Sequence, residues 1–308
     1  MGMENYPRNM LELEKQFSTE KECLEYLSKV RWPEGFICPK CKGSKAWLTN
    51  RGLYHCSQCG FQSSIIAGTV FQDTKKPLKL WFRIIWHITS QKYGTNALGI
   101  QRVFGLGSYR IVWAWLHKLR CAMVRPGRDR LSGIVDIDET YFGGERTGKR
   151  GRGAEGKTLI FVAVESKDNR IGRIRLKRIL DASAESLEPA IKEFVEPGSI
   201  IHTDGWKGYN GVSKIGYKHE VIKDNTGIGI NLLPKVNRVV SLLKRWLLGT
   251  YQGRIEPSHL DYYLDEFTFR FNRRTSNSRG MLFYRLIQQA VAITPVRIRD
   301  IKGGSVVA

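Results

Sequence analysis

Two pairs of cysteines limit what the first part of this chain can fold into more than any other feature. Cys38 and Cys41 form one CxxC pair, Cys56 and Cys59 form another, and residues 42–55 lie between them. Each pair is typical of a knuckle turn that brings two thiolates to one ion, and two knuckles supply the four-thiolate site of structural zinc. The spacing therefore predicts a zinc ribbon. Iron remains a chemical alternative, whereas a thioredoxin-like redox site needs only one CxxC pair.

The other two cysteines, Cys23 and Cys121, fall in apolar helical patterns, and we expect both to be buried as small hydrophobes. Six cysteines in 308 residues do not make a disulfide framework. The chain has neither an apolar signal-peptide core nor a membrane-spanning run of about 20 apolar residues. These observations predict a reducing, intracellular location and no membrane partner.

The charge of the chain indicates what it binds. It carries 50 Lys and Arg against 29 Asp and Glu, a net charge of +21, and its isoelectric point is about 9.9. A protein this basic usually has a polyanionic partner. Hydrophobic residues make up 42% of the chain, which is enough for folded cores and argues against a generic basic tail.

Helical patterns dominate the first 125 residues. Apolar periodicity predicts a helix over residues 11–30 and another, opened by Pro77, through Gln91. Residues 95–115 read as a short helix, a glycine-containing turn and a second helix capped by Ser108, which is helix-turn-helix spacing. We expect this second helix to offer Tyr109, Arg110 and Lys118 to DNA. The alternative is a small helical bundle in which the tryptophans serve only packing.

The remaining chain alternates between strand and helix patterns in the order of a ribonuclease-H-like fold. A Gly-rich basic loop over residues 142–157 follows the first strand, and we expect its Lys149, Arg150 and Arg152 to contact DNA. We expect two late helices, 258–273 and 281–292, to pack outside the fold, and the 235–248 helix to stop at Gly249. The predicted strands cover residues 133–141, 158–166, 170–179, 199–203 and 217–222, and the predicted helices between and after them cover 183–195 and 235–248.

Three polar residues occupy the places where such a fold gathers its metal ligands. Asp138 lies at the end of the first strand, Asp204 follows the fourth strand, and Asn237 lies on the late helix. Oxygen ligands of this kind suit Mg²⁺ or Mn²⁺, and a pair of ions promotes phosphoryl transfer on DNA. Lys244 shares a helical face with Asn237 and is positioned for a phosphate. Asp136 faces the same side of the strand as Asp138 and is a further metal-ligand candidate, the alternative being a solvated strand-edge charge.

At this point the residues resemble a known family. DETYFGG at 138–144, TDGWKGY at 203–209, VNRVVSLLKRWLLGTYQG at 236–253 and YLDEFTFRFNRR at 263–274 look like bacterial insertion-sequence transposases with an N-terminal zinc ribbon, which are related to eukaryotic Merlin elements. The resemblance covers nearly the whole chain. It implies catalytic roles for Asp138 and Asp204, for Asn237 as a variant third ligand, and for Lys244.

The resemblance also implies an activity and its partners. A transposase of this kind binds terminal inverted repeats, cuts them and joins the 3′ ends to target DNA, with a structural Zn²⁺ and two catalytic Mg²⁺ or Mn²⁺ ions. Holding two ends together implies a homodimer or higher oligomer, acting in the bacterial cytoplasm at the nucleoid. Two alternatives stay open: a catalytically inert, sequence-specific DNA-binding regulator, and a structure-selective nuclease.

We therefore expect an α+β multidomain protein in four parts. A helix and the zinc ribbon occupy residues 1–70, and a helix-turn-helix-like region occupies 71–125. A ribonuclease-H-like catalytic domain follows at 126–255, and C-terminal helices with a tail complete the chain at 256–308.

Overall fold

The computed structural model describes residues 5–125, 127–143, 157–168, 170–223, 232–253 and 255–302. Its internal contacts divide the chain into two compact units. Unit 1 combines the N-terminal residues through Arg125 with a C-terminal segment that starts at Thr275, and unit 2 holds the residues from Pro126 to Arg274. No helix among the described residues is both long and apolar enough to cross a membrane.

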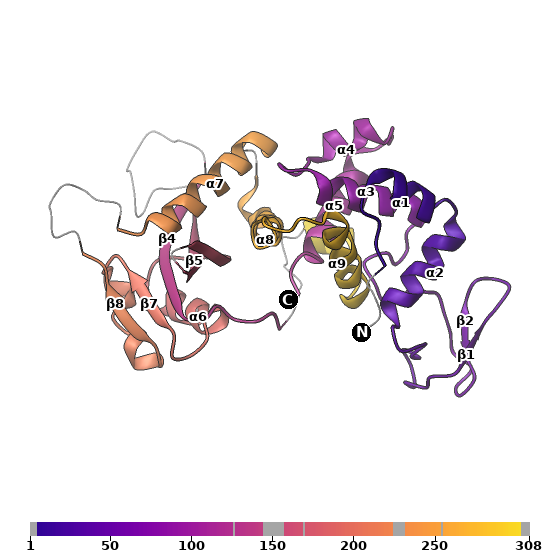
Figure 1. Cartoon of the computed structure of the whole chain (residues 1–308), viewed down its shortest axis with the longest axis horizontal. Helices are drawn as coiled ribbons and strands as arrows, with labels where there is room; N and C mark the ends of the chain where they lie inside the picture. The colour runs from indigo at the N-terminus through magenta and orange to yellow at the C-terminus, as the bar shows by residue number, and fades with distance from the viewer. Residues whose placement is uncertain are drawn as a thin grey trace. The chain divides into compact units, whose positions relative to one another are not determined.

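Unit 1 is helical apart from a small three-stranded sheet (Figure 1). Its strands run in the order β1-β2-β3 and are antiparallel. The elements of unit 1 are α1 (Met10–Gln16), α2 (Glu20–Arg31), β1 (Ala46–Leu48), β2 (Tyr54–Cys56), β3 (Gln62–Ser63), α3 (Leu78–Ser90), α4 (Ala97–Val103), α5 (Tyr109–Cys121), α9 (Arg279–Ala292) and α10 (Ile298–Lys302).

The expected single helix over residues 11–30 is wrong, because the chain forms two helices there. Thr19 and Glu22 make a capping box: each side chain takes up the backbone N–H of the other residue, so a new helix starts at Glu20. The Glu20 carboxylate in turn accepts the N–H groups of Leu78 and Lys79 at 2.7 and 3.2 Å. It thereby caps α3, whose own N-cap, Pro77, makes no side-chain cap.

The helix α9 packs outside the ribonuclease-H-like fold, as expected, and lies in the core of unit 1. Phe283 is fully buried, and its ring lies 5.7 Å from that of Phe82 and 6.0 Å from that of Phe17. The backbone N–H of Val70 also donates to Ala290 O at 3.0 Å. Residues from opposite ends of the sequence therefore stabilise one hydrophobic core.

Unit 2 is built on a five-stranded mixed sheet with the strand order β6-β5-β4-β7-β8. The first three strands along the chain are antiparallel, whereas β7 and β8 join β4 in parallel, which is the ribonuclease-H-like arrangement. The elements of unit 2 are β4 (Ile134–Phe142), β5 (Thr158–Lys167), β6 (Arg170–Ile179), α6 (Ala184–Phe194), β7 (Ile200–Thr203), the 3-10 turns η1 (Lys207–Tyr209) and η2 (Val212–Ile215), β8 (Lys218–Val221), α7 (Pro234–Tyr251), η3 (Pro257–His259) and α8 (Leu260–Phe271).

Alternation along the strands separates two cores, one on each face of the sheet. The helix α6 lies on one face of the sheet and α7 on the other (Figure 1). Val135 and Ile137 of β4 pack with α6, and Ile160 and Val162 of β5 pack with α7. The helix α8 joins the α7 core through residues such as Leu264, so the expectation that this helix packs outside the fold is wrong.

The helix α7 continues past Gly249, where the sequence pattern predicted its end. It runs to Tyr251, and Gln252 takes the left-handed conformation at φ 55° that ends it. The predicted segment 256–308 held both C-terminal helices, but the two units separate them. The helix α8 packs in unit 2 and α9 packs in unit 1. The four domain boundaries themselves stay predictions.

Candidate functional site

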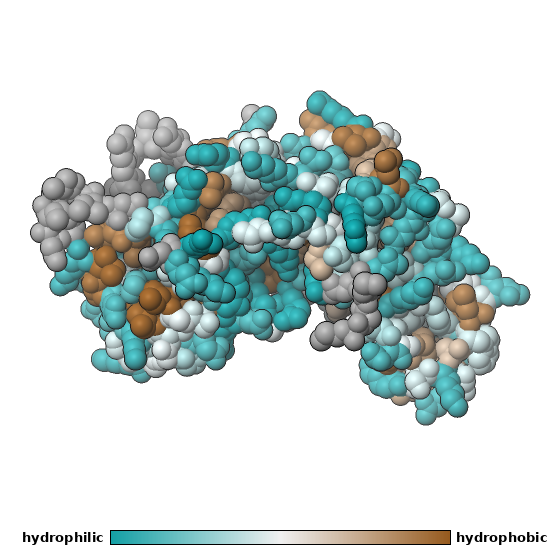
Figure 2. Space-filling model, in the orientation of Figure 1, coloured by the Kyte–Doolittle hydropathy of each residue, from teal (hydrophilic) through white to brown (hydrophobic). Residues whose placement is uncertain are grey.

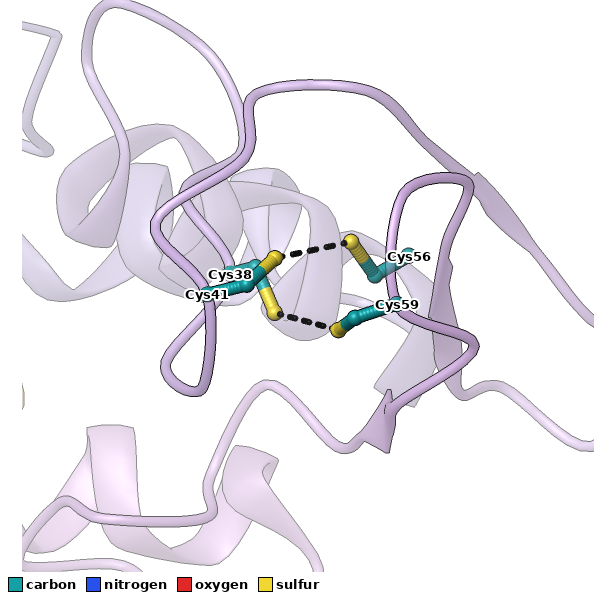
Figure 3. Close-up of side chains that lie close together, drawn as sticks. All are labelled: Cys38, Cys41, Cys56 and Cys59. Carbon is teal, nitrogen blue, oxygen red and sulfur yellow. Dashed lines mark hydrogen bonds between the residues drawn. The ribbon is translucent and has the colours of Figure 1, made fainter.

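The four ribbon cysteines converge, as their spacing predicted. Their sulfur atoms all lie within 4.8 Å of one another, with Cys38 Sγ 3.7 Å from Cys59 Sγ and Cys41 Sγ 3.6 Å from Cys56 Sγ (Figure 3). Cys38 and Cys56 are buried. The two facing pairs therefore enclose a space suited to one tetrahedral ion.

The two knuckles have the same backbone geometry. In the first, Cys38 N donates to Gly43 O and Lys42 N donates to Cys38 O. In the second, Cys56 N donates to Phe61 O and Gly60 N donates to Cys56 O. Lys42 and Gly60 occupy equivalent positions with φ of 64° and 68°, so the tight turn requires the left-handed region in both.

The thiols of the cluster influence one another's pKa values. Burial opposes ionisation of Cys38, but backbone N–H groups of Cys41 and Lys40 outweigh it and lower the pKa of Cys38 to about 6. At Cys41 the Gly43 N–H favours the thiolate, but the neighbouring thiols outweigh it and raise the pKa to about 12. Four thiolates cannot coexist this closely without a divalent ion, so the donor set fits Zn²⁺.

The second site lies in unit 2, where the sheet register aligns the two aspartates. The parallel pairing of β4 with β7 matches Ile134 with Ile200 and Asp136 with His202. The same offset places Asp204, just past the end of β7, level with Asp138. Asp138 is in the middle of β4 and not at its end as expected, and it lies two residues past the last pair with β7.

Tyr209 lies in the core on the α6 side of the sheet and is influenced by the charges of both aspartates. Its side chain is fully buried, and its hydroxyl donates a hydrogen bond to Glu139 Oε1. Burial raises the pKa of Tyr209 well above its usual range, and the charges of Glu139, Asp138 and Asp204 raise it further. The hydroxyl therefore stays protonated and fixes Glu139, which faces away from the Asp138 side as the alternation predicts.

Asp136 has a partner within the sheet. It is 5% exposed, and its Oδ1 lies 3.0 Å from His202 Nδ1. His202 Nε2 lies 3.2 Å from Glu220 Oε2, so the three side chains form one row across β4, β7 and β8. The role of Asp136 as a metal ligand stays a prediction, and the structure engages it with His202.

The helix α7 presents Asn237 and Lys244 on the stripe that the sequence predicted. Asn237 is exposed, and Lys244 is half-buried beside a hollow of about 460 Å³ at the end of β4. Lys157, which directly precedes β5, lines the same hollow. Burial lowers the pKa of Lys244, and the positive charge of Lys157 lowers it further.

The carboxylate site is more open than the thiolate site. Among the residues that the structure describes, the four cysteines are the only set of three or more His, Cys, Asp or Glu side chains gathered closely enough for one ion. The donor set of Asp138, Asp204 and Asn237 consists of oxygen atoms and fits Mg²⁺ or Mn²⁺ by type. Its candidate ligands come from three separate parts of the chain, whereas two turns hold the four ribbon cysteines close together.

The predicted DNA-contacting residues differ in exposure. Tyr109 is 52% exposed and Arg110 is exposed in the first turn of α5, which Ser108 caps through the Ile111 N–H. Lys118 is half-buried, and burial lowers its pKa. Trp115 packs inside, stacked on Trp81 with a ring separation of 4.4 Å. Lys149, Arg150 and Arg152 lie outside the described residues.

The sequence patterns missed several residues around the aspartates. Thr203 Oγ1 lies 2.8 Å from His219 Nε2, and burial lowers the pKa of His219. Strand register and turn geometry determine the positions of this pair, of the Glu139–Tyr209 hydrogen bond and of Lys157, so no local sequence pattern indicates them. Only the position of His202, two residues before Asp204, offered a local signal.

Comparisons with known proteins agree with this architecture. Residues 130–272 match the family model of the ISXO2-like transposase domain, and residues 18–62 match that of the transposase zinc-ribbon domain. An uncharacterized protein in transposable element ISH50 of Halobacterium salinarum is 25% identical over 281 residues, which is 83% of this chain and 92% of that protein.

Two solved structures are similar at low scores. The catalytic core domain of BIV integrase gives a TM-score of 0.32 with 21% identity, over 48% of this chain and 89% of that one. A chain of the simian T-cell lymphotropic virus intasome in complex with PP2A regulatory subunit B56 gamma gives 0.34 with 14% identity, over 61% of this chain and 70% of that one. The fold assignment rests on the strand order and not on these scores.

Proposed function

Because this chain belongs to the insertion-sequence transposases that combine a zinc ribbon with an ISXO2-like transposase domain, we propose that it cuts the ends of its element and joins the 3′ ends to target DNA. The observation that carries the proposal is the parallel register of β4 with β7, which pairs Asp136 with His202 and, extended by two residues, sets Asp204 level with Asp138. Two remote carboxylates at one place on a sheet provide negative charge suited to a divalent metal.

Asp138, Asp204 and the Asn237 amide oxygen are the residues that would hold the catalytic metal. Divalent ions bound there supply activation of the attacking oxygen and stabilisation of the leaving oxygen in phosphoryl transfer. Asn237 is neutral, so it contributes less attraction than a carboxylate. Tyr209 holds Glu139, the neighbour of Asp138 on β4, and thereby fixes the backbone that carries Asp138.

Lys244 and Lys157 are suited to the phosphate of the strand that is cut. Both line the hollow beside β4, and the positive charge of Lys157 lowers the pKa of Lys244. A phosphate between them would relieve this repulsion and hold the DNA backbone next to the aspartates. This adds Lys157 to the lysine that the sequence motif indicated.

Recognition of the element ends is proposed for unit 1. The ribbon and the exposed first turn of α5, with Tyr109 and Arg110, would contact the terminal inverted repeats. The net charge of +21 supplies a sequence-independent attraction to phosphates that falls as salt rises. We further propose at least a dimer, since two ends must be joined, acting on nucleoid DNA in the bacterial cytoplasm.

The test is a strand-transfer assay with duplexes that carry the inverted repeats flanking the gene, in Mg²⁺ or Mn²⁺. Asp138→Ala and Asp204→Ala should each abolish cleavage and joining but leave DNA binding intact. Glu185→Ala is the matched control, because it removes an exposed acid from α6 on the opposite face of the sheet. Specific end binding by a wild-type protein that neither cuts nor joins would contradict the proposal and support an inert regulator.

A further inference from the structure

One face of the ribbon sheet carries a row of side chains that do not serve its core. The register pairs Trp47 of β1 with His55 of β2, and His55 with Gln62 of β3. The Trp47 and His55 rings are stacked, with centroids 4.3 Å apart and planes 13° from parallel. His55 Nδ1 lies 3.1 Å from Gln62 Nε2, and Arg51 donates to Gln62 Oε1 at 3.3 Å.

The core of the ribbon uses other aromatic residues. Tyr54, which neighbours His55 and so faces the other side of β2, stacks on Phe36 at 5.5 Å and contacts Trp32 at 5.0 Å. Trp47 is 53% exposed, although His55 covers one face of its indole. The second face of the indole is therefore open to solvent, and hydrophobic side chains also show at the surface over β1 and β2 (Figure 2).

The charge around this row has one sign. Between Glu34 and Asp73 the sequence contains no Asp or Glu, whereas it contains Lys40, Lys42, Lys45 and Arg51, all of which are exposed. A flat aromatic ring beside an amide and a guanidinium, in a wholly basic segment, suits a nucleic acid strand. An apolar protein partner would not require this charge.

We propose that this row, Trp47–His55–Gln62–Arg51, binds single-stranded DNA by stacking an unpaired base on the open face of Trp47. Within a duplex both faces of each base are covered by neighbouring bases, so the indole has a base to stack on only where pairing has been lost. His55 supports the indole from behind, Gln62 holds His55, and Arg51 lies at the end of the row for a phosphate. The row binds DNA independently of the metal site on the β4–β7 sheet.

The test measures binding of the zinc-loaded full chain to a short oligonucleotide, either single-stranded or as a blunt duplex, without added Mg²⁺. The single strand carries 2-aminopurine, whose fluorescence falls when it stacks on an aromatic ring. Trp47→Ala should weaken single-strand binding by about 5- to 150-fold, since one base–aromatic stack contributes about 1–3 kcal/mol, and should abolish the quenching. Duplex binding should change by less than about twofold, because phosphate contacts dominate it.

Two variants separate stacking from general damage. Trp47→Phe keeps a ring and should retain most of the affinity and quenching. Leu48→Ala removes an equally exposed apolar side chain, 60% exposed, from the next position of β1 and should change neither. Zinc content of each variant reports whether the ribbon is intact.

The proposal fails if Trp47→Ala, with its zinc in place, binds and quenches the single strand as wild type does, or loses single-strand and duplex binding equally. Because no catalytic metal is present, the result does not depend on cleavage or joining. A protein that lacks strand-transfer activity would still give a decisive answer here.

Discussion

The zinc site and the proposed catalytic site of this molecule are assembled in different ways. All four ribbon thiolates come from residues 38–59, and two turns of the same geometry bring them within 4.8 Å of one another. The oxygen donors of the proposed catalytic site come from β4, from the residue after β7 and from α7, over residues 138–237. Asp204 and Asn237 are exposed, and sheet register aligns the aspartates.

This difference determines what each site depends on. The ribbon closes a short loop and has little apolar core of its own, so its folding depends on the ion. The proposed catalytic site is carried by a sheet with a hydrophobic core on each face, so its scaffold should fold without the ion. Loss of metal should therefore unfold the ribbon but only inactivate unit 2.

The largest expected effect is on the ribbon. Cys38→Ser should remove zinc from the protein and unfold residues 35–63, because structural zinc contributes about 10–16 kcal/mol in comparable small sites. Zinc per chain and the amide signals of the ribbon by NMR measure this loss. Cys121→Ser, outside the ribbon, is the control and should keep one zinc per chain. A folded ribbon in the Cys38→Ser variant would remove the contrast between the two sites.

The next effect concerns the amide ligand of the catalytic site. Asn237→Ala should lower the rate of strand transfer by about 100-fold. Removing a residue that only hydrogen-bonds to a metal ligand already costs about 10- to 100-fold, and Asn237 is proposed as a ligand itself. Mn²⁺ should rescue this variant better than Mg²⁺, because it accepts looser geometry. Asn237→Glu should retain activity, since it supplies a third carboxylate. Wild-type rates for Asn237→Ala would show that the third ligand lies elsewhere, with Asp136 the first residue to examine.

A smaller effect tests the scaffold under Asp138. Tyr209→Phe removes the hydroxyl that donates to Glu139 and should lower the free energy of unfolding of unit 2 by about 1.5–3 kcal/mol, the range for hydrogen bonds to charged groups. Tyr217→Phe is matched, because this buried hydroxyl donates to the neutral Val195 O at 3.1 Å and should cost about 1 kcal/mol. Denaturant unfolding measures both. Equal losses of unfolding free energy in the two variants would mean that the Tyr209 hydroxyl does not donate to a charged Glu139 carboxylate.

Much of the fold was predictable because its signals are local. The CxxC spacing indicated the zinc cluster, alternation indicated β4 to β8, and the Ser108 cap and the glycine turn indicated α4 and α5. The single helix predicted over residues 11–30 was wrong because apolar periodicity continues through Thr19, where a capping box starts a second helix. Gly249 was a poor end signal because tertiary packing carries α7 to Tyr251.

The residues that escaped prediction depend on long-range register. The role of Glu139 can be recognised only from the fold, in which η1 brings the Tyr209 hydroxyl to its carboxylate. The role of Lys157 likewise depends on β5, which brings this residue to the hollow beside Lys244. The burial of α8 and α9 likewise follows from packing between distant segments. The roles of Asp138, Asp204, Asn237 and Lys244 in catalysis remain predictions.

The central claim is that strand register joins two remote aspartates into one metal site. The most direct measurement is the Mn²⁺ affinity of the zinc-loaded full chain by calorimetry, for wild type, Asp138→Ala, Asp204→Ala and the double variant. Ligands of the same ion are not additive, so each single variant should weaken binding at least about tenfold and the double variant should lose little more. Wild-type affinity in either single variant, or losses that add in full, would contradict the account.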